Sequence, residues 1–240
     1  MRRSRVLVSL LAAVAMVAAA TLPAWSYQEV AVSDGGTIEG KVVFQGAPPS
    51  LRTVIPTKDK EVCGDIRKEP RIVLAPDNGV KNAIVYLKDV EKGKAWTKPE
   101  KTPAIDNQKC RFTPEIQAVP VGNIEIANSD PVLHNTHGYL GRRTVFNVAL
   151  PNQGERVKRE LKRPGVVEVK CDAHGWMQVW TLVADNPYYA ITAEDGTFTI
   201  RDVPPGTYTL VAFQSYAGPV ETPVTVKAKD TVSLTVELKK

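Results

Sequence analysis

Short runs of alternating apolar and polar residues dominate the chain after its first 26 residues. Examples are 37–44, 83–87, 166–169 and 232–238, and Gly, Pro, Asn or Asp residues lie near their ends. Alternation with a period of two is typical of strands that bury one face, and long helical periods are nearly absent. The pattern therefore predicts an all-β protein.

The first 26 residues follow a different pattern. A basic head, 1–5, precedes an uncharged apolar run, 6–20, which ends in small residues. This order is typical of a secretory signal peptide, and we place the mature start near Tyr27, with cleavage after Ala20 or an uncleaved anchor as alternatives. The sequence thus predicts a periplasmic or otherwise exported protein with no membrane span after signal removal.

The charge balance gives no indication of a nucleic-acid partner. The chain has 31 basic and 26 acidic side chains, but three arginines lie in the predicted signal, which leaves 28 against 26. A loose basic stretch, 156–163, contains Glu160 and carries no aromatic residues on which bases could stack. We therefore interpret this stretch as a solvated face and expect no nucleic acid to bind.

Three stretches follow the signal: an N-terminal β segment at 36–103, a middle stretch at 104–184 and a last stretch at 185–240. The last contains the sequence EDGTFTIRDVPPGTYTLVAF. It resembles the carboxypeptidase regulatory-like family, which are small prealbumin-like β-sandwiches. The family's opening runs, Gly-x-Val and Gly-x-x-x-Ala-x-Val, are missing just before this sequence and stand instead at 40–42 and 79–85. We therefore hypothesise that the first and last stretches form one discontinuous sandwich around the middle one.

Three cysteines in an oxidising compartment indicate one disulfide and one thiol kept for another purpose. Cys171 is the one with chemistry around it, because His174 and Met177 follow it closely. We therefore predict that Cys63 and Cys110 form the disulfide, with two free buried thiols as the alternative.

The run from Cys171 to Met177 follows the strand-like run 166–170, so a thiolate, an imidazole and a thioether converge within one turn. A second pair of imidazoles, His134 and His137, follows the polar turn 128–131. Soft sulfur ligands and imidazoles suit an ion that cycles between Cu(I) and Cu(II), and one Cys, two His and a weak axial Met form a blue-copper site. The sequence predicts one copper ion. His137 could be a ligand or could only support the site from outside the ligand set. A zinc ion held by His134 and His137 together with Cys171 and His174 is an alternative.

The region 112–183 resembles the cupredoxins in its order of strand, Gly turn, strand and first ligand, and in its Cys-x2-His-x2-Met spacing. The resemblance implies a Greek-key β-sandwich with His134, Cys171, His174 and Met177 as ligands. It assigns Asn135 to hydrogen bonds that link the two ligand loops. It also implies that His174 reaches the surface, where it and Trp176 would let electrons leave.

Together these observations predict two β-sandwiches and a periplasmic electron carrier with a blue-type copper site, not an enzyme. A redox protein such as a c-type cytochrome or a dehydrogenase is the expected partner. Two other functions stay open. The first is a copper chaperone or scavenger, and the second is an interaction module whose metal is structural.

Overall fold

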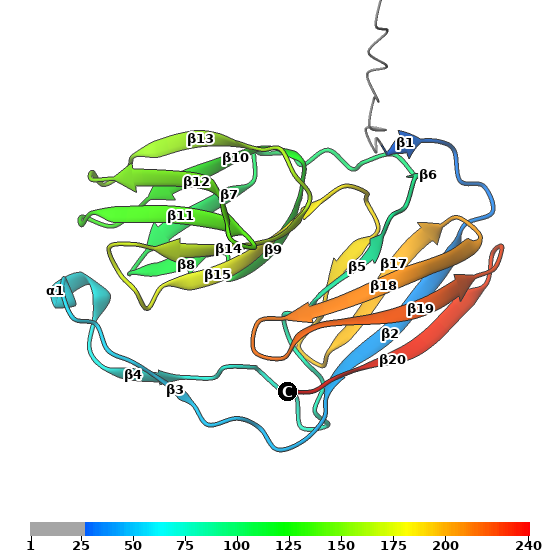
Figure 1. The fold of residues 1–240 in the computed structure, drawn as a ribbon, viewed down its shortest axis with the longest axis horizontal. Coiled ribbons are helices and arrows are strands. Elements are labelled where there is room, and N and C mark those ends of the chain that lie inside the picture. Colours follow the sequence, from blue (N-terminus) through cyan, green and yellow to red (C-terminus); the bar gives the residue numbers. More distant parts are fainter. Residues whose placement is uncertain (1–26) are drawn as a thin grey trace, which may run out of the picture.

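The computed structural model describes residues 27–240, so the predicted signal peptide lies outside the described residues. This part of the chain is almost entirely β-structure, with one short helix, α1 (Lys60–Cys63). Figure 1 shows two β-sandwiches side by side and an extended segment that reaches along one side from one sandwich to the other. No helix within 27–240 has the length and apolar character needed to cross a membrane. The all-β prediction is confirmed.

The middle stretch forms one sandwich, which we call the inserted sandwich. Its five-stranded sheet has the order β12-β11-β14-β15-β9, and its four-stranded sheet has the order β13-β10-β7-β8. The bounds are β7 (Ala104–Gln108), β8 (Arg111–Thr113), β9 (Ile116–Pro120), β10 (Gly122–Asn128), β11 (His134–Leu140), β12 (Arg143–Leu150), β13 (Arg156–Leu161), β14 (Gly165–Cys171) and β15 (Gln178–Ala184). Apolar side chains of both sheets fill its core.

Strands from both ends of the chain form the second sandwich, which we call the outer sandwich. Its sheets have the orders β16-β5-β18-β19 and β17-β2-β20. The bounds are β2 (Gly36–Phe44), β5 (Ile84–Lys88), β16 (Tyr189–Ile191), β17 (Thr197–Val203), β18 (Gly206–Gln214), β19 (Gly218–Val226) and β20 (Thr231–Leu238). Strand β2 lies between β17 and β20, and β5 lies between β16 and β18. The first and last stretches therefore share both sheets.

The polar alternation read from the sequence orients these strands. In β17, Phe198 and Ile200 are buried while Thr197 and Thr199 are exposed, as the period of two requires. The buried members of such strands form a single core that contains residues from both ends of the chain. Burial of these faces is what holds the discontinuous parts together.

One long excursion, residues 45–78, leaves the outer sandwich after β2 and returns beside it, and we call it the arm. The N–H of Phe44 donates to the carbonyl of Asn78 at 2.9 Å, which closes its base. The arm contains the strand pair β3 (Arg52–Val54) and β4 (Arg67–Glu69), with α1 between them. In Figure 1 the arm carries α1 away from the outer sandwich to the end of the inserted one.

The two sandwiches also touch directly. Ile84 of the outer sandwich forms a buried cluster with Leu182 and Ala184 of the inserted one. The rings of Trp180 and Phe213 lie 6.4 Å apart, centroid to centroid, across the same contact. A further pair of short strands, β1 (Gln28–Glu29) and β6 (Lys92–Gly93), lies where the chain passes between the sandwiches.

Candidate metal centre

The pairing of two strands brings His134 close to Cys171. β11 and β14 pair antiparallel with Thr136 opposite Cys171, and His134 lies two residues before Thr136, so both candidate ligands lie on the same face of the sheet. Residues an even number apart in a strand share a face. His134 and Cys171 therefore both point into the inserted sandwich, where His134 is fully buried and Cys171 is 2 % exposed.

His174 completes the group from the loop that joins β14 to β15. Two backbone hydrogen bonds hold this loop: Cys171 N–H donates to the carbonyl of Met177 at 3.3 Å and joins its ends, and Met177 N–H donates to the carbonyl of His174 at 2.9 Å within it. The closed turn directs the His174 imidazole back toward the sulfur of Cys171. His174 is fully buried.

Three donor atoms converge at this point. Sγ of Cys171 lies 3.6 Å from Nδ1 of His134 and 3.7 Å from Nδ1 of His174, and the two Nδ1 atoms lie 3.1 Å apart. Metal–nitrogen bonds of about 2.1 Å and metal–sulfur bonds of about 2.3 Å, at tetrahedral or trigonal angles, place the nitrogen and sulfur atoms about 3.6–3.8 Å apart. The three atoms are spaced to hold one metal ion.

Each of the two imidazoles contacts one carboxylate through Nε2, on the side away from the Cys171 sulfur. Nε2 of His134 lies 2.9 Å from Oδ2 of Asp130, and Nε2 of His174 lies 2.9 Å from Oδ2 of Asp59. A carboxylate that accepts a hydrogen bond from the Nε2–H group keeps the proton on Nε2 and leaves the Nδ1 lone pair free for a metal. Both lone pairs then face each other at short range, an arrangement that a cation between them stabilises. The donor set therefore fits a metal ion that accepts both thiolate and imidazole ligands, as copper and zinc do.

Burial sets the protonation of the site before metal enters. It lowers the pKa of His134, and the hydrogen bond to Asp130 only partly opposes that effect. Burial also raises the pKa of the Cys171 thiol, against the hydrogen bonds that it receives from backbone N–H groups, including that of Asn135. Metal binding must therefore displace the thiol proton, while the His134 imidazole already has a free lone pair.

His137 does not join these ligands. It lies three residues after His134 in β11, and an odd separation places it on the opposite face of the sheet. There its Nδ1 lies 2.9 Å from Oδ2 of Asp172 and its Nε2 lies 2.9 Å from Oγ1 of Thr144. The strand period thus removes His137 from the ligand set and, with it, the four-ligand zinc alternative, which required both histidines of the pair.

Met177 is buried beside Cys171 in the core of the inserted sandwich, at 3 % exposure. Its backbone closes the ligand loop as described above, and its role as axial ligand stays a prediction.

Asn135 links the two loops through its backbone: its N–H lies 3.5 Å from Sγ of Cys171, and its carbonyl accepts from Asp172 N–H at 3.0 Å. Its buried Oδ1 has no hydrogen-bond partner among residues 27–240.

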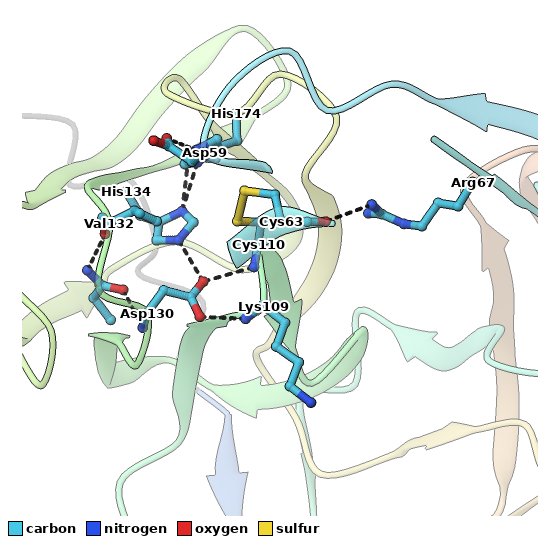
Figure 2. Close-up of a disulfide and its surroundings, with 11 residues drawn as sticks. Asp59, Cys63, Arg67, Lys109, Cys110, Asp130, Val132, His134 and His174 are labelled. Carbon is cyan, nitrogen blue, oxygen red and sulfur yellow. Dashed lines mark hydrogen bonds and ion pairs between the residues drawn. A yellow bond between two sulfur atoms is a disulfide. The ribbon is translucent and has the colours of Figure 1, made fainter. Parts of the chain in front are cut away.

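The tip of the arm covers the site, and this corrects one expectation. We expected His174 to reach the surface, but its imidazole is fully buried because Asp59, just before α1, lies against Nε2. Figure 2 shows Asp59 over His174, with the disulfide beside the two imidazoles. Trp176 remains half-buried at the edge of the site, its ring centroid 5.0 Å from that of His174.

The disulfide anchors the arm at this position. Cys63, the last residue of α1, is bonded to Cys110, as the sequence predicted. Both sulfurs lie in the core of the inserted sandwich. Asp130 connects this anchor to the metal centre, since it accepts from the N–H groups of Lys109 and Cys110 at 2.6 and 2.8 Å while it contacts His134 (Figure 2).

Sequence reasoning missed both carboxylates. Asp130 had a signal, because it lies four residues before His134 in the polar turn that precedes the first ligand. Asp59 had none, since it is 115 residues from His174 and only the fold of the arm brings them together.

Comparison with known proteins gives one family match. Residues 178–239 match the model of the carboxypeptidase regulatory-like domain, so the resemblance of the last stretch is confirmed. The first seven matched residues form β15, which belongs to the inserted sandwich. No curated protein matches the chain.

Similar solved structures include copper proteins. A copper-containing nitrite reductase from Thermus scotoductus SA-01 is 21 % identical, with 38 % of this chain and 24 % of that chain covered and a TM-score of 0.32. A purple cupredoxin from Nitrosopumilus maritimus is 23 % identical over 34 % of this chain and 99 % of that one, with a TM-score of 0.31. Amicyanin from Paracoccus versutus is 13 % identical over 36 % and 85 %, with a TM-score of 0.32. The chain spans about a quarter of the nitrite reductase.

Proposed function

We propose that this chain is an exported, periplasmic electron carrier that holds one copper ion, and that it is not an enzyme. The observation that carries the proposal is the convergence of the Cys171 sulfur and two imidazole Nδ1 atoms within 3.1–3.7 Å in a buried site. One thiolate and two imidazoles in a trigonal arrangement are the equatorial ligands of blue-copper centres. When bound, copper would supply a one-electron couple, and Met177 would be a further ligand beside the thiolate and the two imidazoles.

The protein part of this function is to hold the ligands in one geometry in both oxidation states. His134 and His174 are each fixed at Nε2 by a carboxylate, and the disulfide and backbone bonds fix those carboxylates in turn. Burial keeps water away from the sulfur. Rigid, dry ligands minimise rearrangement when an electron arrives or leaves, which favours electron transfer over substrate chemistry.

The electron route differs from the one expected from the sequence. His174 is covered, so we propose that electrons pass through Trp176 and the exposed part of the ligand loop near Gly175. A redox protein such as a c-type cytochrome or a dehydrogenase would make a small, short-lived contact there.

Copper titration of the purified mature protein tests the proposal. We expect one equivalent of copper to produce a strong thiolate-to-copper absorption band and a type 1 electron paramagnetic resonance spectrum. Cys171→Ser should abolish the band, whereas His137→Gln, on the opposite face of the same strand, should retain it. A colourless protein that binds zinc instead would contradict the proposal.

Copper handling is the rival, and one measurement separates the two functions. A carrier should cycle reversibly between two oxidation states without losing metal, even with an excess of a copper chelator present. A chaperone should give up its copper to the chelator within the same time. The buried ligands and the anchored arm favour retention.

A further inference from the structure

A cleft of about 540 Å³ lies where the arm and the two sandwiches meet, and it borders the metal centre, since Trp176 and Met177 of the ligand loop are among its lining residues. The arm supplies one wall, the ligand loop and the start of β15 supply another, and the end of β18 supplies the third. Its volume lies in the range of small-molecule sites, which occur preferentially at domain interfaces. Neither the proposed copper chemistry nor the fold of either sandwich accounts for it.

Positive charge is in excess along the cleft. Six basic side chains line it against three acidic ones, Glu69, Glu115 and Glu168; the basic ones are Arg52, Arg67, Arg71, Lys81, Arg111 and Lys240. Such an excess in a concave, partly desolvated place attracts anions, because low-dielectric walls concentrate the field.

One carboxylate is shared by three of these cations. Glu69 accepts from Arg52 at 2.8 Å and from Arg67 at 2.7 Å, and Arg111 lies 2.9 Å away. The group carries two positive charges in excess. Burial alone would raise the pKa of Glu69, but hydrogen bonds from Arg52 and Arg67 outweigh it and hold that pKa below its usual value. Arg71, which lies nearby in the arm, takes part in no ion pair within residues 27–240.

Aromatic side chains from both sandwiches are part of the apolar lining of the cleft. Trp176 and Trp180 come from the inserted sandwich, and Phe213 and Tyr216 come from the outer one. Aromatic faces bind planar rings, and guanidinium groups bind carboxylates through paired hydrogen bonds. A ligand with an aromatic ring and a carboxylate could therefore contact both kinds of side chain.

We propose that this cleft binds a small aromatic carboxylate, with its ring against the aromatic side chains and its acid group at the arginines. The site requires no metal, so it goes beyond the electron-carrier function and can be tested without copper.

Calorimetric titration of the metal-free mature protein tests the proposal, with 2-naphthoate as probe and neutral 2-naphthamide as its matched control. We expect saturable one-to-one binding of the naphthoate. The amide should bind about tenfold more weakly or worse, because it lacks the charge-assisted hydrogen bonds, and the loss of one such bond lowers affinity by about that factor. Equal affinities, or no saturable binding of naphthoate, would overturn the proposal.

Paired variants locate the site. Arg71→Gln, in the cleft, should weaken naphthoate binding by about tenfold. Lys158→Gln removes the same charge from β13, which does not line the cleft, and should leave the affinity within about twofold. Equal losses in both variants would mean that only net charge matters, and would contradict a built site. Both residues are exposed, so both variants should fold.

Discussion

Oδ2 of Asp59 lies 2.9 Å from Nε2 of His174, although the two residues are 115 positions apart. The contact joins the arm to the innermost part of the metal centre. It places a negative charge one imidazole away from the proposed ion. Because a carboxylate stabilises the more positive oxidation state, this contact should lower the reduction potential.

Asp59→Asn should therefore raise the potential. A unit charge roughly 6 Å away at an effective dielectric constant of about 20 is worth about 3 kcal/mol, which corresponds to a rise on the order of 100 mV. Voltammetry of the copper-loaded protein measures it. Asp65→Asn removes the same charge from an exposed place in the same arm and should change the potential little; equal shifts in both variants would refute a specific role for Asp59.

Removing the anchor should release the cover over His174. In the simple chain-entropy model, a double Cys63→Ala, Cys110→Ala variant loses about 4 kcal/mol of stability, because the disulfide closes a loop with a sequence separation of 47. Urea unfolding of the metal-free protein measures this loss. In the copper-loaded variant, electron exchange with a small redox reagent should become faster as His174 gains solvent access. An unchanged exchange rate would show that the cover does not limit access.

The arginine cluster around Glu69 should make stability depend on pH. The pKa of Glu69 is lower in the folded protein than its usual value of about 4.3, so its stabilisation is complete above that value and is lost as the pH falls through the folded pKa. Glu69→Gln should therefore flatten the acid limb of a plot of unfolding free energy against pH. Glu237→Gln, an exposed site, should leave that limb as it is in the parent protein. The same slope in all three proteins would contradict the prediction.

Gly79 should be intolerant of a side chain. A Cβ atom there would lie 1.9 Å from the carbonyl oxygen of Asp195, where the first stretch of the chain packs on the last. Overpacking of this kind costs about 1–3 kcal/mol. Thermal unfolding of Gly79→Ala measures the cost, and Gly175→Ala is the control because its Cβ would meet nothing within 4 Å. A Gly79→Ala protein as stable as the control would mean that the contact between the two stretches is looser than described.

Local pattern predicted much of this protein because it acts over a few residues. Period-two alternation identified strands such as β17 and β20, and the spacing of Cys171, His174 and Met177 placed three candidate ligands in one turn. One interpretation, the open ligand role of His137, needed the strand period applied more strictly. His134 and His137 are three apart in a strand, so their opposite faces could have been read from the sequence.

The sequence by itself determined the all-β class, the disulfide pair and the residue types at the metal centre, because these depend on short-range periodicity and on counting cysteines. Only the tertiary structure decided that Asp59 would cover His174, that the imidazole would lose its expected exposure, and that three segments would enclose a cationic cleft. Such contacts join residues from tens to more than a hundred positions apart. They depend on where the arm folds back and on how the sandwiches pack, which no local pattern records.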